Sequence, residues 1–140
     1  MYIVLNPSLF NSEIMVCDLH KVSLFILNEI EGFQLTGSKD PDKILVHLHD
    51  KFSTAEIILT LGEDGSWYMS SEEKVYQQCV PVSVIDTTAA GDTYTGYFIA
   101  SRLLGMSVTD SMRRAAFASA IACTRKGAAP SIPSKSEVIY

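Results

Sequence analysis

The segment Asp86-Thr87-Thr88-Ala89-Ala90-Gly91-Asp92 lies between an apolar stretch, residues 82–85, and a long apolar helix expected over residues 92–104. Small side chains in this loop let successive backbone N–H groups converge at the N-terminus of the helix. The groups concerned belong to Ala89, Ala90 and Gly91. Such a loop offers an anion several donors together with the helix dipole. Asp92 lies at its mouth, where a carboxylate could take a proton from an attacking hydroxyl. The alternative is an ordinary acidic residue in a first helical turn, and the strand-loop-helix context favours a site.

Strands and helices alternate in the part of the chain before this loop, and two helices follow it, which predicts an α/β layered sheet. The expected strands are residues 2–5, 23–27, 56–61 and 82–85, with an antiparallel hairpin over 66–70 and 74–80. The expected helices are residues 12–20, a helical turn through 33 closed by Gly37, a helix starting near 41, residues 92–104, and residues 109–126 closed by Gly127. The sequence contains no repeat and no linker, so it predicts one organisational unit.

Composition excludes several classes of protein. The chain has 140 residues and 15.4 kDa, and 47% of its residues are hydrophobic, which excludes intrinsic disorder. A net charge of −5 and a pI near 5.1 argue against a nucleic-acid surface. No apolar run reaches the ~18 residues that span a membrane. The mean hydropathy of +0.17 is high for a short chain and indicates surface that is built to be covered.

Cysteine and histidine usage points to a reducing cytoplasm and to no metal cluster of these residues. Cys17, Cys79 and Cys123 are odd in number and far apart, so neither a disulfide framework nor a zinc site is expected. His47 and His49 are two positions apart and would face different sides of a helix.

Two further polar segments follow predicted strands. The first is a glycine-rich turn, for which the alternative is an ordinary hairpin turn. Its residues are Thr60, Leu61, Gly62, Glu63, Asp64 and Gly65. The second contains Asn28 and Glu31, which share one face of a helical turn and could hold water around a phosphate-bound Mg²⁺. On spacing alone, a capped helix start is the better interpretation of Asn28 and Glu31. The sequence contains neither a Walker loop nor a dinucleotide fingerprint.

In this order, the motifs resemble the ribokinase-like (PfkB) family of carbohydrate kinases. Asp86–Asp92, continued by Thr93-Tyr94-Thr95-Gly96, is similar to that family's C-terminal signature, and residues 124–133 are similar to the end of ribokinases. Residues 27–37 match the family's N-x-x-E segment, and residues 60–65 match its nucleotide loop. The resemblance covers essentially the whole chain. It implies a three-layer, ribokinase-like (Rossmann-like) sheet with flanking helices, without the N-terminal strands and the β-lid.

The resemblance also implies a role for each matching residue. Asp92 would be the catalytic base, and Ala89, Ala90 and Gly91 the anion hole for the γ-phosphoryl group of ATP. Asn28 and residues 60–65 would contact ATP, and Glu31 would organise Mg²⁺ through water. A monovalent cation, usually K⁺, would be held by Asp86, Thr88, Ala122, Arg125, Gly127 and Ser131, several of them through backbone carbonyls. Some relatives place a polar side chain near the adenine, where this chain has Ala116.

The family segment that carries most sugar contacts, with its G-G-x-x-x-N region, has no counterpart here. Residues 1–140 are therefore interpreted as the C-terminal, nucleotide-binding portion of an incomplete PfkB domain. The expected function is ATP-dependent phosphorylation of a sugar hydroxymethyl group, ribose to ribose 5-phosphate, with little activity in the isolated chain. Two alternatives stay open: a non-catalytic nucleotide-binding or self-associating fragment, and a PfkB kinase for fructose or a nucleoside. Self-association would use an exposed sheet edge.

Overall fold

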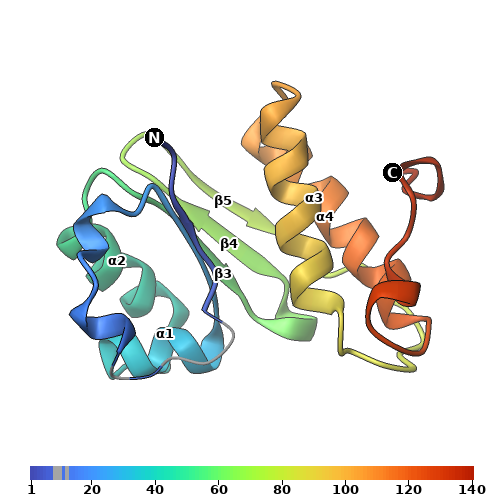
Figure 1. Cartoon of the computed structure of the whole chain (residues 1–140), viewed down its shortest axis with the longest axis horizontal. Coiled ribbons are helices and arrows are strands. Elements are labelled where there is room, and N and C mark those ends of the chain that lie inside the picture. Colours follow the sequence, from blue (N-terminus) through green and yellow to red (C-terminus); the bar gives the residue numbers. More distant parts are fainter. Residues whose placement is uncertain (8–10, 12) are drawn as a thin grey trace. The chain divides into compact units, whose positions relative to one another are not determined.

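The computed structural model describes residues 1–7, 11 and 13–140, and these form two compact units (Figure 1). We call them the sheet unit, residues 1–61 with 66–76, and the helix-pair unit, residues 62–65 with 77–140. The sequence predicts one organisational unit because nothing in it resembles a linker. The structure adds a division that is not marked by composition, and each unit is described separately below.

The sheet unit is built on a mixed sheet with the strand order β1-β2-β3-β4-β5. The strands are β1 (Val4–Leu5), β2 (Leu24–Asn28), β3 (Glu56–Thr60), β4 (Ser66–Met69) and β5 (Lys74–Gln77). β1, β2 and β3 are parallel, with Asn28 opposite Thr60, and β4 runs antiparallel to β3. The strands expected over 2–5, 23–27 and 56–61 are confirmed, as are the two adjoining strands expected over 66–70 and 74–80. The expected α/β class is confirmed as well.

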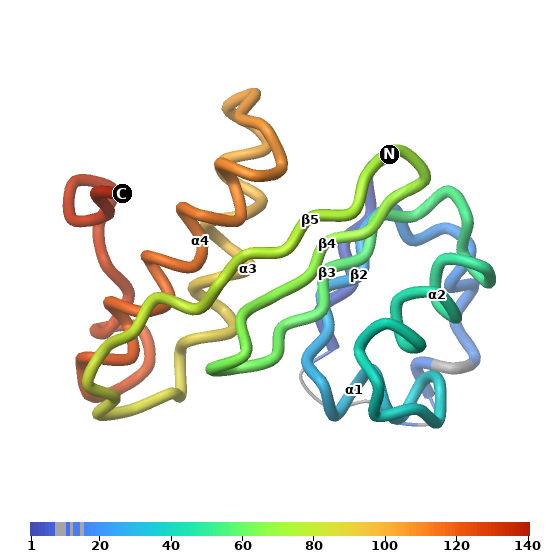
Figure 2. The backbone as a smooth tube through the Cα atoms, turned by 180° about the vertical axis from the view of Figure 1, so that it is seen from behind, coloured from blue at the N-terminus to red at the C-terminus, as the bar shows by residue number. Residues whose placement is uncertain are grey.

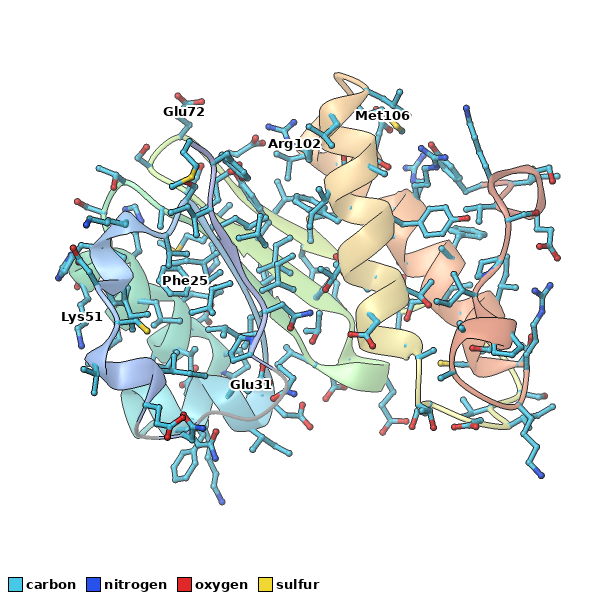
Figure 3. The ribbon with its side chains drawn as sticks, viewed as in Figure 1. Phe25, Glu31, Lys51, Glu72, Arg102 and Met106 are labelled. Carbon is cyan, nitrogen blue, oxygen red and sulfur yellow. The ribbon has the colours of Figure 1, made fainter. Side chains whose placement is uncertain are left out.

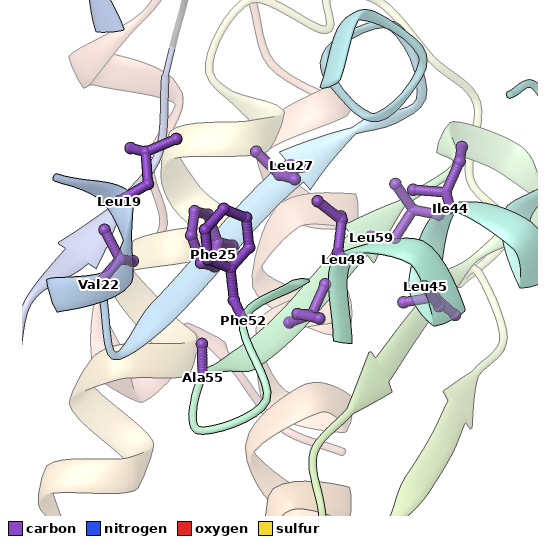
Figure 4. Close-up of a cluster of buried hydrophobic side chains, with 11 residues drawn as sticks. Leu19, Val22, Phe25, Leu27, Ile44, Leu45, Leu48, Phe52, Ala55 and Leu59 are labelled. Carbon is purple, nitrogen blue, oxygen red and sulfur yellow. The ribbon is translucent and has the colours of Figure 1, made fainter. Parts of the chain in front are cut away.

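Two helices, α1 (Glu29–Thr36) and α2 (Pro41–Lys51), contact the sheet and cover a hydrophobic core. Phe25 and Leu27 of β2 are fully buried against Leu45 and Leu48 of α2 and their neighbours (Figure 4). α2 begins where expected, because the side chain of Asp40 accepts hydrogen bonds from the first-turn amides. α1 ends at the left-handed Gly37, as expected from its sequence.

The single helix expected over residues 12–20 is wrong. Two short 3-10 helices, Ile14–Val16 and Leu19–Lys21, occupy this stretch, and Ser12 lies outside the described residues. Cys17 adopts an extended conformation between them, and its N–H donates to Ile14 O. The three-residue spacing of this bond belongs to a 3-10 turn and not to an α-helix.

The helix-pair unit is built on α3 (Ala90–Leu103) and α4 (Val108–Cys123), which pack side by side along their length (Figure 2). Phe98 of α3 and Met112 of α4 are fully buried. Burial of the first helix on several sides was expected, yet Leu103 and Leu104 are 83% and 64% exposed. Two 3-10 helices, Ala129–Ser131 and Lys135–Glu137, follow. Among the described residues, no helix is both long and apolar enough to cross a membrane.

α4 ends at Cys123, so the expected helix to residue 126 with Gly127 as its cap is wrong. Continuing the helix would require the N–H of Gly127 to bond to Cys123 O. Instead, Cys123 O accepts from Ile85 and Asp86, at 2.8 and 3.2 Å, and the N–H of Gly127 donates to the Asp86 carboxylate at 3.0 Å. A segment distant in sequence thus takes the hydrogen bonds that the helix would have used.

The strand expected over residues 82–85 is also wrong. These residues form no regular element, and Val84 and Ile85 are 61% and 66% exposed. Pro81 lacks an N–H group, and the backbone bond from Ile85 goes to the end of α4 instead of to a neighbouring strand. An apolar, β-branched stretch therefore has strand composition but no partner strand among the described residues.

Candidate functional site

Asn28 and Glu31 close the N-terminus of α1 with reciprocal hydrogen bonds. The Asn28 side-chain oxygen accepts from the N–H of Glu31, and Glu31 Oε2 accepts from the N–H of Asn28, each at 2.9 Å. This capping box is the simpler of the two interpretations offered by the sequence. Glu31, labelled in Figure 3, is 5% exposed, and burial raises the pKa of its carboxyl despite the bond from Asn28.

The cap uses the side-chain oxygen of Asn28 and leaves its amide nitrogen available. No described residue accepts a hydrogen bond from that nitrogen, and the Asn28 side chain is exposed at the end of β2. An exposed amide donor at the carboxyl end of a parallel strand is well placed to contact an anionic ligand.

Residues 60–65 join β3 to β4 through a 3-10 helix, Gly62–Asp64. Gly62 and Gly65 have φ values of 58° and 83°, a region that L-residues with side chains rarely adopt. Thr60 donates its hydroxyl to Leu27 O at 3.3 Å, which ties the turn to the neighbouring strand. The hairpin geometry offered as the simpler interpretation is therefore present, with the side chains of Glu63 and Asp64 exposed.

The N-terminus of α3 differs from those of the other α-helices. Side chains of Asn28, Asp40 and Ser107 accept first-turn N–H groups in α1, α2 and α4. The N-cap of α3 is Ala89, which has no side-chain oxygen, and no side-chain cap is present. Among the described residues, α3 is thus the one α-helix in which no side chain accepts from the N-terminal amides.

The start of α3 forms hydrogen bonds with the preceding loop and with α4. The N–H of Ala90 donates to Thr87 O at 3.1 Å, and the hydroxyl of Ser119 donates to Ala90 O at 3.0 Å. Of the three amides expected in the anion hole, that of Ala90 is therefore engaged. Gly91 and Asp92 are exposed, and a Cβ placed on Gly91 would meet nothing within 4 Å. A side chain at Gly91 would therefore meet no other atom of the chain at van der Waals distance.

Asp86 links the loop to the segment after α4. One carboxylate oxygen accepts from the N–H and the hydroxyl of Thr88, at 2.9 and 2.5 Å, and the other accepts from the N–H of Gly127. These bonds, the Thr88 hydroxyl first, lower the pKa of Asp86 below its ordinary value. Three of the six residues expected at the monovalent-cation site are thus in direct contact.

The other three residues of that set lie in the last turn of α4 and in the segment that follows it. Ala122 O accepts from the N–H of Arg125 at 3.1 Å, and the fully buried Ser131 donates its hydroxyl to Ala128 O at 2.6 Å. The guanidinium of Arg125 forms an ion pair with Glu137 at 2.5 Å. Ala116 is half-buried on α4.

Three residues that support this arrangement are missing from the sequence-based set: Ser119, Cys123 and Glu137. Ser119 is the polar interruption of an alanine-rich helix, and Ser134 and Glu137 have the S-x-x-E spacing of a capping box. Both of these signals are visible in the sequence. Cys123 acts through its backbone carbonyl, which no side-chain pattern reveals.

The fold and the loop before α3 together define an α/β protein of the ribokinase-like class. The family model for pfkB family carbohydrate kinases matches residues 1–135. The chain belongs to this family.

Individual relatives agree with that assignment. Ribokinase from Haemophilus influenzae is 32% identical over 145 residues, which cover 98% of this chain and 46% of that protein. Ribokinase from Schizosaccharomyces pombe is 47% identical over 83 residues, 59% of this chain and 26% of the relative. The solved structure of Arabidopsis thaliana ribokinase complexed with ribose and ATP is 30% identical, with a TM-score of 0.79 over 86% of this chain and 40% of that one. The chain thus spans less than half the length of each.

Proposed function

We propose that this chain supplies the nucleotide-binding portion of an ATP-dependent sugar kinase, with ribose as the substrate that becomes ribose 5-phosphate. Asp92 is the general base, which takes the proton from the sugar's primary hydroxyl as that oxygen attacks the γ-phosphorus; the bond from the γ-phosphorus to the β–γ bridging oxygen breaks and ADP leaves. The amides at the α3 N-terminus bind the transferring phosphoryl oxygens. Family membership and the ribose and ATP in the A. thaliana relative support this proposal.

The uncapped N-terminus of α3 is the observation that carries the proposal. Replacing a good side-chain cap by alanine costs about 0.5–2 kcal/mol in an ordinary helix. This chain has alanine at that position, followed by Gly91 and open space. An anionic ligand would supply the missing acceptors, and a phosphoryl group also complements the dipole of the helix.

ATP contacts are assigned to two other places. In the sheet unit, the free amide of Asn28 donates to phosphate oxygens. The turn over residues 60–65 contacts the nucleotide. Glu31 acts on Mg²⁺ through water, the role that the family resemblance implies, while its Oε2 accepts from the N–H of Asn28. Mg²⁺ commonly keeps several waters when it binds nucleotide phosphates, so an indirect contact suits the ion.

A monovalent cation fits the oxygen-rich segment around Asp86. The set offers one carboxylate, two hydroxyls and backbone carbonyls, and K⁺ is held in proteins by oxygen ligands of this kind. Asp86, Thr88 and Gly127 are already in contact, and the hydrogen bonds to the Asp86 carboxylate lower its pKa, which favours the negatively charged form. With K⁺ bound, the site would supply a fixed positive charge near the phosphate-binding amides.

The base assignment is tested by transfer of labelled γ-phosphate from ATP to ribose in the presence of Mg²⁺ and K⁺. We expect only weak turnover from residues 1–140 alone, because they span less than half the length of the relatives described above. Asp92→Asn should reduce that turnover about 10²- to 10⁴-fold, since it removes the proton acceptor. Asp110→Asn is the matched control, a first-turn aspartate of α4 in the same unit. Equal activity in Asp92→Asn and wild type would refute the assignment.

Self-association is the second candidate, favoured by the apolar segment at residues 82–85. Its side chains are exposed and no described strand pairs with it. A second copy that covered these side chains would remove apolar surface from water. Light scattering after gel filtration should then give a dimer mass that Val84→Lys converts to a monomer mass. A monomer at every concentration would exclude this function.

A further inference from the structure

The segment that follows α4 is held by the C-terminal 3-10 helix, Lys135–Glu137. Glu137 Oε1 forms the ion pair with Arg125, while its Oε2 accepts from the N–H and hydroxyl of Ser134, at 2.7 and 2.9 Å. The carboxylate therefore has both oxygens engaged, one with Arg125 and one with the backbone at the start of its own helix.

The residue that Glu137 holds belongs to the proposed cation site. The guanidinium of Arg125 is the part that pairs with Glu137, whereas the proposed cation ligand is its backbone carbonyl. Two residues later, the N–H of Gly127 donates to Asp86. The ion pair with Glu137 holds the end of the Arg125 side chain, and the bond to Asp86 holds the backbone at Gly127, so the short stretch between them is restrained at both ends.

The rest of the C-terminal segment is tied to α3 and α4 by separate contacts. Tyr97 of α3 donates its hydroxyl to Pro133 O at 2.7 Å, immediately before Ser134. The rings of Phe117 on α4 and Tyr140 lie 6.0 Å apart. Glu137 therefore projects from a segment that the helix pair itself anchors, so it can act as a fixed support for Arg125.

We propose that Glu137 is a positioning residue for the monovalent-cation site: it fixes Arg125, and through Arg125 the backbone that presents carbonyl oxygens to the cation. The inference rests on the cation site of the proposed function. Glu137 does not touch the cation, the nucleotide or the sugar. Its effect is to hold the backbone carbonyls that bind the cation in position, as residues hydrogen-bonded to metal ligands orient those ligands in other metal sites.

The test measures cation affinity without requiring catalysis. Thermal unfolding of the chain is followed in KCl, with choline chloride keeping the ionic strength constant, and the K⁺ concentration at half-maximal stabilisation is compared among variants. Glu137→Gln should raise that concentration about tenfold, because glutamine can serve only one of the two partners. Lys135→Gln, on the same 3-10 helix, is the control and should leave it unchanged.

Two further variants separate positioning from general stability. Arg125→Gln keeps the backbone carbonyl and should weaken K⁺ as much as Glu137→Gln, with no further loss in the double variant. Ser134→Ala removes one bond to Glu137 and should give a smaller change in the same direction. If Glu137→Gln lowers the melting temperature but leaves the K⁺ concentration at half-maximal stabilisation unchanged, the positioning role of Glu137 is refuted and the cation site is not. If K⁺ does not stabilise the wild-type chain, both the cation site and this inference are refuted.

Discussion

Replacing Asn28 by aspartate should separate its two roles. The side-chain oxygen of Asn28 caps α1, and the amide nitrogen, which no described residue accepts from, is the group we assign to ATP. Aspartate keeps an oxygen in the capping position but presents no amide donor. Alanine removes both groups. The two substitutions therefore have different effects on folding and on nucleotide binding.

The magnitudes follow from the contacts. Asn28→Ala should lower the free energy of unfolding by about 1 kcal/mol, the usual cost of losing an N-cap. Asn28→Asp should leave it nearly unchanged, because aspartate caps helices as well as asparagine. A hydrogen bond to a charged phosphate is worth about 1.5–3 kcal/mol, so both variants should bind Mg·ATP at least about tenfold more weakly. In Asn28→Asp, repulsion between carboxylate and phosphate adds to that loss.

Urea unfolding and calorimetry with Mg·ATP measure the two effects in parallel. Asp40→Ala is the matched control, because it removes the N-cap of α2 in the same unit without an assigned nucleotide contact. It should unfold as easily as Asn28→Ala and bind Mg·ATP with wild-type affinity. Wild-type affinity in Asn28→Asp would refute the contact with ATP. A stability loss in Asn28→Asp as large as in Asn28→Ala would refute the division of roles.

Two further predictions concern stability. Gly32→Ala should lower the free energy of unfolding in urea by about 1 kcal/mol, although alanine has the better helix propensity. The new Cβ would lie 3.0 Å from Ile44 Cγ2 and 3.2 Å from Leu59 Cδ1, and both side chains are buried. A variant more stable than wild type would contradict this packing. Arg125 and Ser134 hold the pKa of Glu137 at about 2, so the stability it contributes is present above the ordinary value of 4.5 and lost as pH falls toward 2. Circular dichroism against pH should show a shallower acid transition in Glu137→Gln than in wild type. An unchanged profile would show that the Glu137 carboxyl does not contribute to stability against acid.

Features set by neighbouring residues could be predicted from the sequence. The caps at Asn28 and Asp40 and the turn at Gly37 depend on residues within four positions of each other, and all three are present. The apolar strands at the centre of the sheet could also be predicted from the sequence. Both faces of these strands are buried, so they occur in the sequence as continuous hydrophobic runs. The family resemblance located the loop before α3 for the same reason, as a contiguous motif.

Features decided by distant partners could not be predicted in this way. Gly127 has the composition of a helix cap, but its N–H is taken by Asp86, forty-one positions earlier in the chain. Residues 82–85 have strand composition, but a strand requires a partner that no local pattern supplies. The role of Cys123 depends on a backbone carbonyl, so its side chain carries no signal for it.

Nitrogen–proton correlation spectra of the chain with increasing Mg·ATP test the central claim most directly, with adenosine as the control lacking phosphates. We expect the amide resonances of Gly91 and Asp92 to shift with Mg·ATP and not with adenosine, because the phosphates would occupy the uncapped end of α3. Amides of residues 60–65 should shift with Mg·ATP as well. Spectra in which Mg·ATP leaves Gly91 and Asp92 unmoved at saturation would contradict the account.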